Sequence, residues 1–167
     1  LNLTGLPPSS KELERLVAGN SPNAYPRLIE RLLASHHYGE HWARFWLDKA
    51  RYTDAPQFRD DPDGLPWLYR DWVIRAFNDN LPFDDFITYQ LAGDLFAEPS
   101  LDQQIASGYH RLHLVIDVGT ALPEESFHRN VVDRVTAFGT ALLGLTVQCA
   151  QCHDHKYDPV TQRDFYQ

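Results

Sequence analysis

The sequence of 167 residues contains no methionine and only two cysteines. It has no apolar run that approaches the ~20 residues of a membrane-spanning helix, and no signal peptide is visible. A phosphate-binding loop, a Gly-x-Ser-x-Gly elbow and a dinucleotide-binding fingerprint are also missing. Basic residues are scarce, with 15 Lys and Arg against 23 Asp and Glu and a net charge of −8. Nucleic acid and anionic membrane surfaces are therefore not expected as partners.

Length and composition are those of one domain. The 43% hydrophobic and 13% aromatic residues are enough for a sizeable core. We therefore expect a single domain over residues 1–167. The abrupt opening and closing stretches predict that this domain has been excised from a larger multidomain protein, in which a signal sequence would precede it.

Helical signals dominate the chain and predict an all-α, irregular multi-helix domain with long loops. Apolar residues recur at the spacing of one helix face. The predicted helices lie between Ser9 and Gly19 and over residues 25–34, 39–52, 67–78, 83–96, 100–109 and 123–144. Residues 53–66 and 112–122 are expected as loops, and short strands over 112–118 and 143–147 are the less favoured alternative.

Local signals mark two of the helix starts. Ser9 and Glu12 have the spacing of a capping box. Ser21 followed by Pro22 has the form of an N-cap and a first helical residue. We expect His36 and His37 to close the helix that follows, where positive charge suits the helix dipole.

Both cysteines lie in one short segment, Cys149-Ala150-Gln151-Cys152-His153. The form Cys-x-x-Cys-His is the attachment sequence of a c-type haem. Two thiols three positions apart can reach the two vinyl groups of one porphyrin, and the next residue then presents an imidazole to the iron. We predict one haem c enclosed by the helices and covalently attached through Cys149 and Cys152, with His153 as an axial ligand through Nε2. Attachment of this kind normally occurs outside the cytoplasm, so we expect a periplasmic or otherwise exported location.

Two other interpretations of the cysteine pair remain open. A thioredoxin-like redox pair should start a helix in a βαβ pattern, which the sequence does not show. Zinc is the stronger competitor, because Cys149, Cys152 and His155 have a possible ligand spacing and His153 or an acidic residue could complete the set. Structural zinc sites usually draw their ligands from two separated clusters, whereas this chain offers one.

Several longer segments carry a family resemblance. They are residues 3–8, 38–48, 69–74, 90–95, 149–159 and 163–166. Together they resemble the planctomycete cytochrome C domain family, and the resemblance covers nearly the whole chain. It implies a c-type cytochrome module carried in a large exported protein of unknown function. Where many members of that family carry methionine, after a Gly-aromatic-His/Asn-Arg segment, this chain has Leu114.

The second axial ligand of the iron is not supplied by the motif or by methionine. His155 lies within about 7 Å of His153 along the chain, whereas ligands on opposite haem faces need Cα atoms roughly 12 Å apart. We therefore expect His155 to bond a haem propionate or to hold its loop. The resemblance favours His110 and His113 as the second ligand, and an open position is the alternative. The remaining histidines are His36, His37, His41 and His128.

The second ligand decides the predicted function. Two histidines give a saturated iron suited to one-electron transfer with a redox partner or with neighbouring domains. An open position would instead give a haem enzyme or a module that binds a small ligand, which Arg111 could polarise. A structural interaction domain stabilised by haem or zinc is the third alternative.

Overall fold

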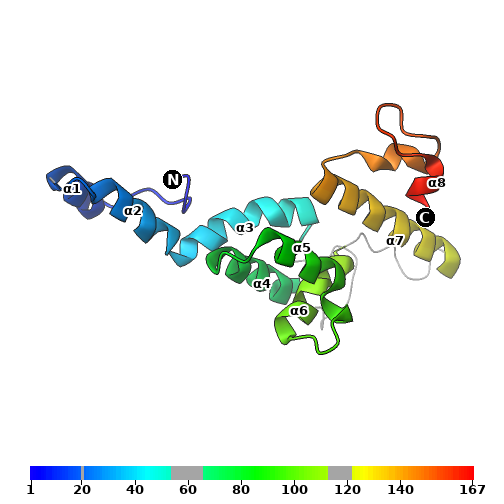
Figure 1. Ribbon diagram of the computed structural model, residues 1–167, viewed down its shortest axis with the longest axis horizontal. Helices are drawn as coiled ribbons and strands as arrows, with labels where there is room; N and C mark the ends of the chain where they lie inside the picture. The colour runs from blue at the N-terminus through cyan, green and yellow to red at the C-terminus, as the bar shows by residue number, and fades with distance from the viewer. Residues whose placement is uncertain (20, 54–65, 113–121) are drawn as a thin grey trace. The chain divides into compact units, whose positions relative to one another are not determined.

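The computed structural model describes residues 1–19, 21–53, 66–112 and 122–167, which are all-α (Figure 1). Its α-helices are α1 (Ser10–Ala18), α2 (Ala24–Leu33), α3 (His36–Ala50), α4 (Pro66–Asn78), α5 (Phe83–Ala92), α6 (Leu101–Ala106), α7 (Pro123–Phe138) and α8 (Gln162–Phe165). Shorter turns are the 3₁₀ segments η1 (Gly93–Leu95), η2 (Ser107–Arg111) and η4 (Val147–Gln151) and the π segment η3 (Gly139–Leu143). The all-α prediction is confirmed. The described residues contain no strand, so the alternative over 143–147 was wrong, and the one over 112–118 lies almost wholly outside them.

Helix starts follow the local signals in part. The capping box of α1 is present, because the Ser9 side chain accepts from the Glu12 N–H and Glu12 returns a bond to the Ser9 N–H. The predicted cap at Ser21 was wrong, since α2 begins at Ala24 and Asn23 is its N-cap.

The prediction for His36 and His37 was also wrong. These residues open α3 instead of closing α2, because the chain turns at Ala34 and Ser35 and the Tyr38 N–H donates to the Ser35 carbonyl at 2.9 Å. Their side chains therefore lie at the positive end of a helix dipole.

Two predicted helices end early at glycines that closely approach a neighbouring segment. A Cβ on Gly93 would lie 2.1 Å from the Gln103 carbonyl oxygen, and one on Gly139 would lie 2.4 Å from Val147 Cγ2. The helical path changes at both points, to 3₁₀ geometry at Gly93 and to π geometry at Gly139. Apolar periodicity continues through these positions, so the sequence pattern gave no sign of the change.

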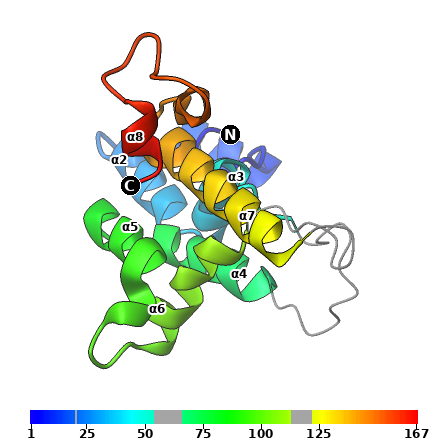
Figure 2. The same ribbon diagram turned by 90° about the vertical axis from the view of Figure 1, so that its right-hand side faces the viewer.

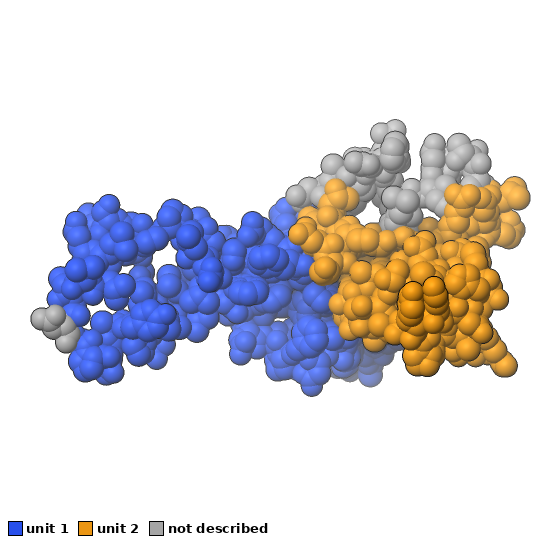
Figure 3. Space-filling view, turned by 90° about the horizontal axis from the view of Figure 1, so that it is seen from above, with its two compact units in different colours: residues 1–47, 67–107 blue, residues 48–66, 108–167 orange. Residues whose placement is uncertain are grey.

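The chain divides into two compact units, which Figure 3 colours separately. Unit 1 comprises residues 1–47 and 67–107, and unit 2 comprises residues 48–66 and 108–167. None of the described helices is both long and apolar enough to cross a membrane. Each unit is built around its own buried side chains.

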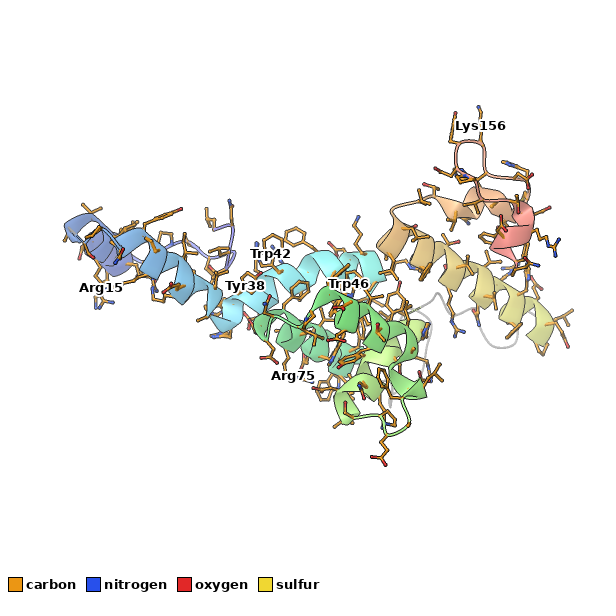
Figure 4. All side chains as sticks on the ribbon, viewed as in Figure 1. Arg15, Tyr38, Trp42, Trp46, Arg75 and Lys156 are labelled. Atoms are coloured by element: carbon orange, nitrogen blue, oxygen red, sulfur yellow. The ribbon has the colours of Figure 1, made fainter. Side chains whose placement is uncertain are left out.

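Unit 1 has an aromatic core. Trp72 of α4 stacks on Phe86 of α5 with ring centroids 5.2 Å apart, and Val73 is fully buried beside them. Trp46 reaches this core from α3, with its ring 5.0 Å from that of Phe86 (Figure 4). Trp42, on the same helix, is 37% exposed, so this core includes only part of the tryptophan set.

A single buried amide joins the three helices of this core. Gln90 is 1% exposed, and its Oε1 accepts from Trp46 Nε1 at 2.8 Å and from the Tyr69 hydroxyl at 2.6 Å. Its Nε2 donates to the Phe86 carbonyl at 2.9 Å. Both lone pairs of the amide oxygen and one of the two N–H groups are therefore used.

Replacing Gln90 with leucine should lower the free energy of unfolding of unit 1 by about 1–3 kcal/mol, because the buried Tyr69 hydroxyl loses this acceptor and Trp46 Nε1 keeps the Tyr69 oxygen in place of two acceptors. Denaturant unfolding followed by tryptophan fluorescence measures this unit directly, since all four tryptophans lie in it. Gln104→Leu is the matched control, because Gln104 is exposed on α6, and surface changes stay within about ±0.5 kcal/mol. Equal effects of the two substitutions would contradict this role of Gln90.

Unit 2 is built on α7. Its core contains Val132 of α7, Val147 and Ala150 of η4, and Phe165 of α8. The short α8 lies beside α7 in both ribbon views (Figures 1 and 2). Arg51 is held against α7 by an ion pair with Asp133 at 2.6 Å. The core therefore lies directly behind η4, which contains Cys149 and is followed by Cys152 as its C-cap.

Candidate functional site

One of the two cysteines lies in η4, and the other is its C-cap, three positions later. A 3₁₀ helix has three residues per turn, so side chains three positions apart point the same way. Val147 and Ala150 face the core and are 7% and 0% exposed, whereas Cys149 and Cys152 are exposed free thiols. The packed pair fixes the turn, and both thiols are left exposed.

His153 follows directly and its ring is oriented by the backbone. Nδ1 lies 2.8 Å from the Asp154 carbonyl oxygen, which can only accept, so Nδ1 carries the proton. In the neutral ring Nε2 then keeps its lone pair. A backbone carbonyl on the second nitrogen is the usual arrangement for a histidine that ligates a metal.

His155 holds the loop between η4 and α8. Its N–H donates to the Val160 carbonyl at 2.8 Å, and its Nδ1 accepts from the Asp158 N–H at 3.0 Å. The side chain is only 8% exposed. Lys156 extends from the tip of this loop (Figure 4). Of the two roles expected for His155, loop support is the one with contacts among the described residues.

Hydrogen bonds from α8 and from the residue after it hold the cysteine motif in place. The Gln151 carbonyl accepts from Gln162 Nε2 at 3.0 Å and from the Tyr166 hydroxyl at 3.1 Å, and Asp154 Oδ1 accepts from the Gln162 N–H at 2.8 Å. A capping box begins α8, and the hydrogen bonds from Thr161 lower the pKa of Asp164. The spacing of Thr161 and Asp164 is a readable helix-start signal. Nothing in the sequence pattern indicated the roles of Gln151, Gln162 or Tyr166.

The histidines considered for the second ligand fall into three groups. His110 lies in η2 of unit 2, where its ring meets Tyr109 edge-on at 5.9 Å and its carbonyl accepts from Arg134 Nε at 3.1 Å. Arg111 is exposed at the end of the same turn. His113 and Leu114 lie outside the described residues. The three N-terminal candidates, His36, His37 and His41, belong to unit 1, whereas the cysteine motif belongs to unit 2.

His128 lies closer to the motif than its position in the sequence suggests. Its ring stacks on Tyr166, with centroids 5.9 Å apart and planes 17° from parallel. Tyr166 in turn bonds the Gln151 carbonyl inside the motif. The structure therefore turns this side chain of α7 toward the C-terminal helix that supports the site.

The donor set of the motif can be compared with what a zinc ion and a c-type haem each need. Among the described residues, the motif offers no three of Cys149, Cys152, His153 and His155 with ligand atoms within 4.8 Å of one another. Zinc needs that convergence, whereas the two thioether bonds of a c-type haem form at separate carbons of the porphyrin.

Two buried polar atoms of unit 2 have unused hydrogen-bonding capacity. They are the hydroxyl of Tyr109, which is 8% exposed, and Oδ1 of Asn130 on α7. Burial raises the pKa of Tyr109, against an opposing effect of the Arg51 charge. Buried polar atoms nearly always have a hydrogen-bond partner. These two atoms could therefore each bond a further polar group.

One family model matches the chain over residues 1–167, and it is described as "PSCyt2: Protein of unknown function (DUF1549)". No curated protein and no solved structure matches the chain. The match includes the cysteine motif, η2 and both compact units.

Proposed function

The chain belongs to the PSCyt2 family of unknown function, and from that membership and its Cys-x-x-Cys-His turn we propose that it is a monohaem c-type cytochrome module. The sequence resemblance to the planctomycete cytochrome C domain family is confirmed by the same match. In this proposal Cys149 and Cys152 form the thioether bonds and His153 is an axial ligand. The module transfers single electrons within an exported multidomain protein.

The observation that carries the proposal is that the motif combines two exposed thiols, a turn packed against the core and an imidazole oriented by the backbone. Two exposed thiols lie on one side of a turn whose other side is packed into the core. The adjacent imidazole has its Nδ1 proton bound by the Asp154 carbonyl, which leaves Nε2 for iron. A bound haem supplies a one-electron couple. The chain's own part is to fix the ring of His153 and to support the turn from α8.

Accessibility supports electron transfer as the role. Cys149, Cys152 and His153 are all exposed, so a group held by them is within reach of a redox partner or of a neighbouring domain. The net charge of −8 suits a basic or neutral partner surface. For the second axial position we propose a histidine of the segment that contains His110 and His113, which gives a saturated iron.

A visible spectrum of the full chain, made in a host that attaches c-type haem, tests the proposal. We expect the chromophore to remain with the denatured polypeptide and a low-spin oxidised form with two nitrogen ligands. A high-spin oxidised form that readily binds cyanide would contradict the proposal of two histidine ligands. It would show an open iron position and favour the ligand-binding alternative. Metal analysis that gives stoichiometric zinc and no haem would refute the cytochrome proposal.

The second ligand is tested by His110→Ala and His113→Ala, each compared with His128→Ala. Loss of the ligand should convert the oxidised form to high spin, because water or no group then occupies that side of the iron. The His128 variant should keep the original spectrum. Unchanged spectra in both the His110 and His113 variants would remove this segment from the coordination sphere.

A further inference from the structure

A second group of potential metal ligands lies in unit 1, outside the cysteine motif. The ligand atoms of His36, His37 and Glu40 all lie within 4.8 Å of one another on the first turns of α3. Nδ1 of His37 is 2.7 Å from Glu40 Oε2, and the two imidazole rings have centroids 3.8 Å apart. The haem proposal assigns no role to any of the three.

The backbone that carries these side chains is firmly held. Asn78 of α4 accepts from the Gly39 N–H at 2.8 Å through Oδ1 and donates to the His36 carbonyl at 3.2 Å through Nδ2. Gly39 lies so close to α4 that a Cβ there would be 2.4 Å from the Ile74 carbonyl oxygen. The first turn of α3 is therefore fixed against its neighbour, and only side-chain rotation is left to adjust the three ligand atoms.

The spacing suits a small divalent cation. Zinc bonds of ~2.0–2.1 Å place the ligand atoms of a tetrahedral site roughly 3.3 Å apart. His37 Nδ1 and Glu40 Oε2 are 2.7 Å apart, and no two of the three ligand atoms are more than 4.8 Å apart. Small side-chain rotations can therefore bring each pair to the separation of a tetrahedral site. The Nδ1 proton that His37 now donates to Glu40 can sit on Nε2 instead, which frees the Nδ1 lone pair.

The chemistry of the set selects the class of metal. Two imidazoles and one carboxylate are ligands for borderline cations such as Zn²⁺, and three protein ligands leave a fourth position for water. The carboxylate also offsets the partial positive charge at the start of α3, which by itself disfavours a cation. Part of each side chain is exposed, so an ion can enter without rearrangement of the core.

The geometry points to a zinc-type site formed by His36, His37 and Glu40, independent of the haem. Its ligands come from consecutive turns of one helix, so a bound ion links the first two turns of α3. The fourth coordination position of the ion is left for an exchangeable water. The site lies wholly within unit 1. It is a cation-binding site of the full chain whether or not haem is attached.

Calorimetric titration of the full, untagged, haem-loaded chain with Zn²⁺ tests this site. We expect one binding event that His36→Ala and Glu40→Gln each weaken at least about tenfold, since even the hydrogen-bond partners of metal ligands are worth 10–100-fold. Asp48→Asn is the matched control, because Asp48 is another exposed carboxylate of α3. Circular dichroism checks that each variant keeps its helical content. No zinc binding, or equal loss in Glu40→Gln and Asp48→Asn, overturns the inference.

A parallel titration with Co²⁺ separates this site from the cysteine motif. In a haem-free chain with both cysteines replaced by serine, cobalt bound at α3 should give visible d–d bands without thiolate charge-transfer absorption. These bands should be lost in His36→Ala and retained in His128→Gln. A chain that fails to attach haem but binds cobalt in this way refutes the proposed function alone, and a haem-loaded chain that binds no zinc refutes the α3 site alone.

Discussion

Replacing both Cys149 and Cys152 with serine should abolish covalent haem attachment completely. The two thiols are the only cysteines of the chain, and both are exposed and unpaired. Serine has nearly the same shape as cysteine but forms no thioether bond, so the loss is chemical and the turn keeps its packing. Haem staining after denaturing electrophoresis, together with the intact mass, measures attachment.

Two controls show that the loss of attachment comes from the missing thiols: the single substitutions and the helical content of the double variant. Cys149→Ser or Cys152→Ser alone leaves one thioether bond and should give a partly retained chromophore with one unreacted vinyl group. Far-ultraviolet circular dichroism should show the helices of unit 1 unchanged in the double variant, because their core lies in other residues. Haem that stays bound to the denatured double variant, or wild-type protein that never carries haem, would contradict the assignment.

The parts of this fold that the sequence predicted are those set by local chemistry. The capping box of α1 and the stop at Gly19 depend on residues within a few positions of one another, and both are present. The all-α class follows from apolar periodicity in the same way. The exposure of both cysteines likewise goes with a spacing of three residues that matches one turn of a 3₁₀ helix.

Other features depend on tertiary contacts that no local pattern contains. Gly139, where the π turn begins, has no room for a side chain because Val147 occupies that space. The start of α3 at His36 is fixed by Asn78, which is 42 residues away in the sequence. That displacement is what brings His36 and His37 next to Glu40, so the second ligand group was not predictable from a helix assumed to end there.

The candidate site was predicted to a similar extent. Cys149, Cys152 and His153 were identified from their spacing, and their role in holding a haem stays a prediction; the structure shows that all three are exposed. The acceptor of the His153 proton and the support from Tyr166 were not identified, because carbonyl and hydroxyl contacts leave no pattern in a sequence. Chain length alone excluded His155 as the second ligand of the iron that His153 would bind. The contacts of His155 within its loop became known only from the structure.

Phe165→Ala should be the most destabilising single substitution in unit 2. Phe165 is 6% exposed and packs with Val147 and Ala150 directly behind the cysteine turn. Truncation of a buried phenylalanine costs about 3–5 kcal/mol, because a cavity remains that the surroundings fill only in part. Helix α8 has four residues, too few to persist without this anchor. Its bonds to Gln151 should therefore be lost with it.

Thermal unfolding of the haem-loaded chain and amide hydrogen exchange over residues 147–153 measure this effect together. The melting temperature of unit 2 should fall, and the turn should exchange faster while the helices of unit 1 stay protected. Tyr157→Ala is the matched control, because Tyr157 is an aromatic residue of the adjoining loop and 82% exposed. It should change stability by no more than about 0.5 kcal/mol. If the two substitutions had equal effects, the cysteine turn would not depend on the core behind it, and the support of His153 would have to come from the loop alone.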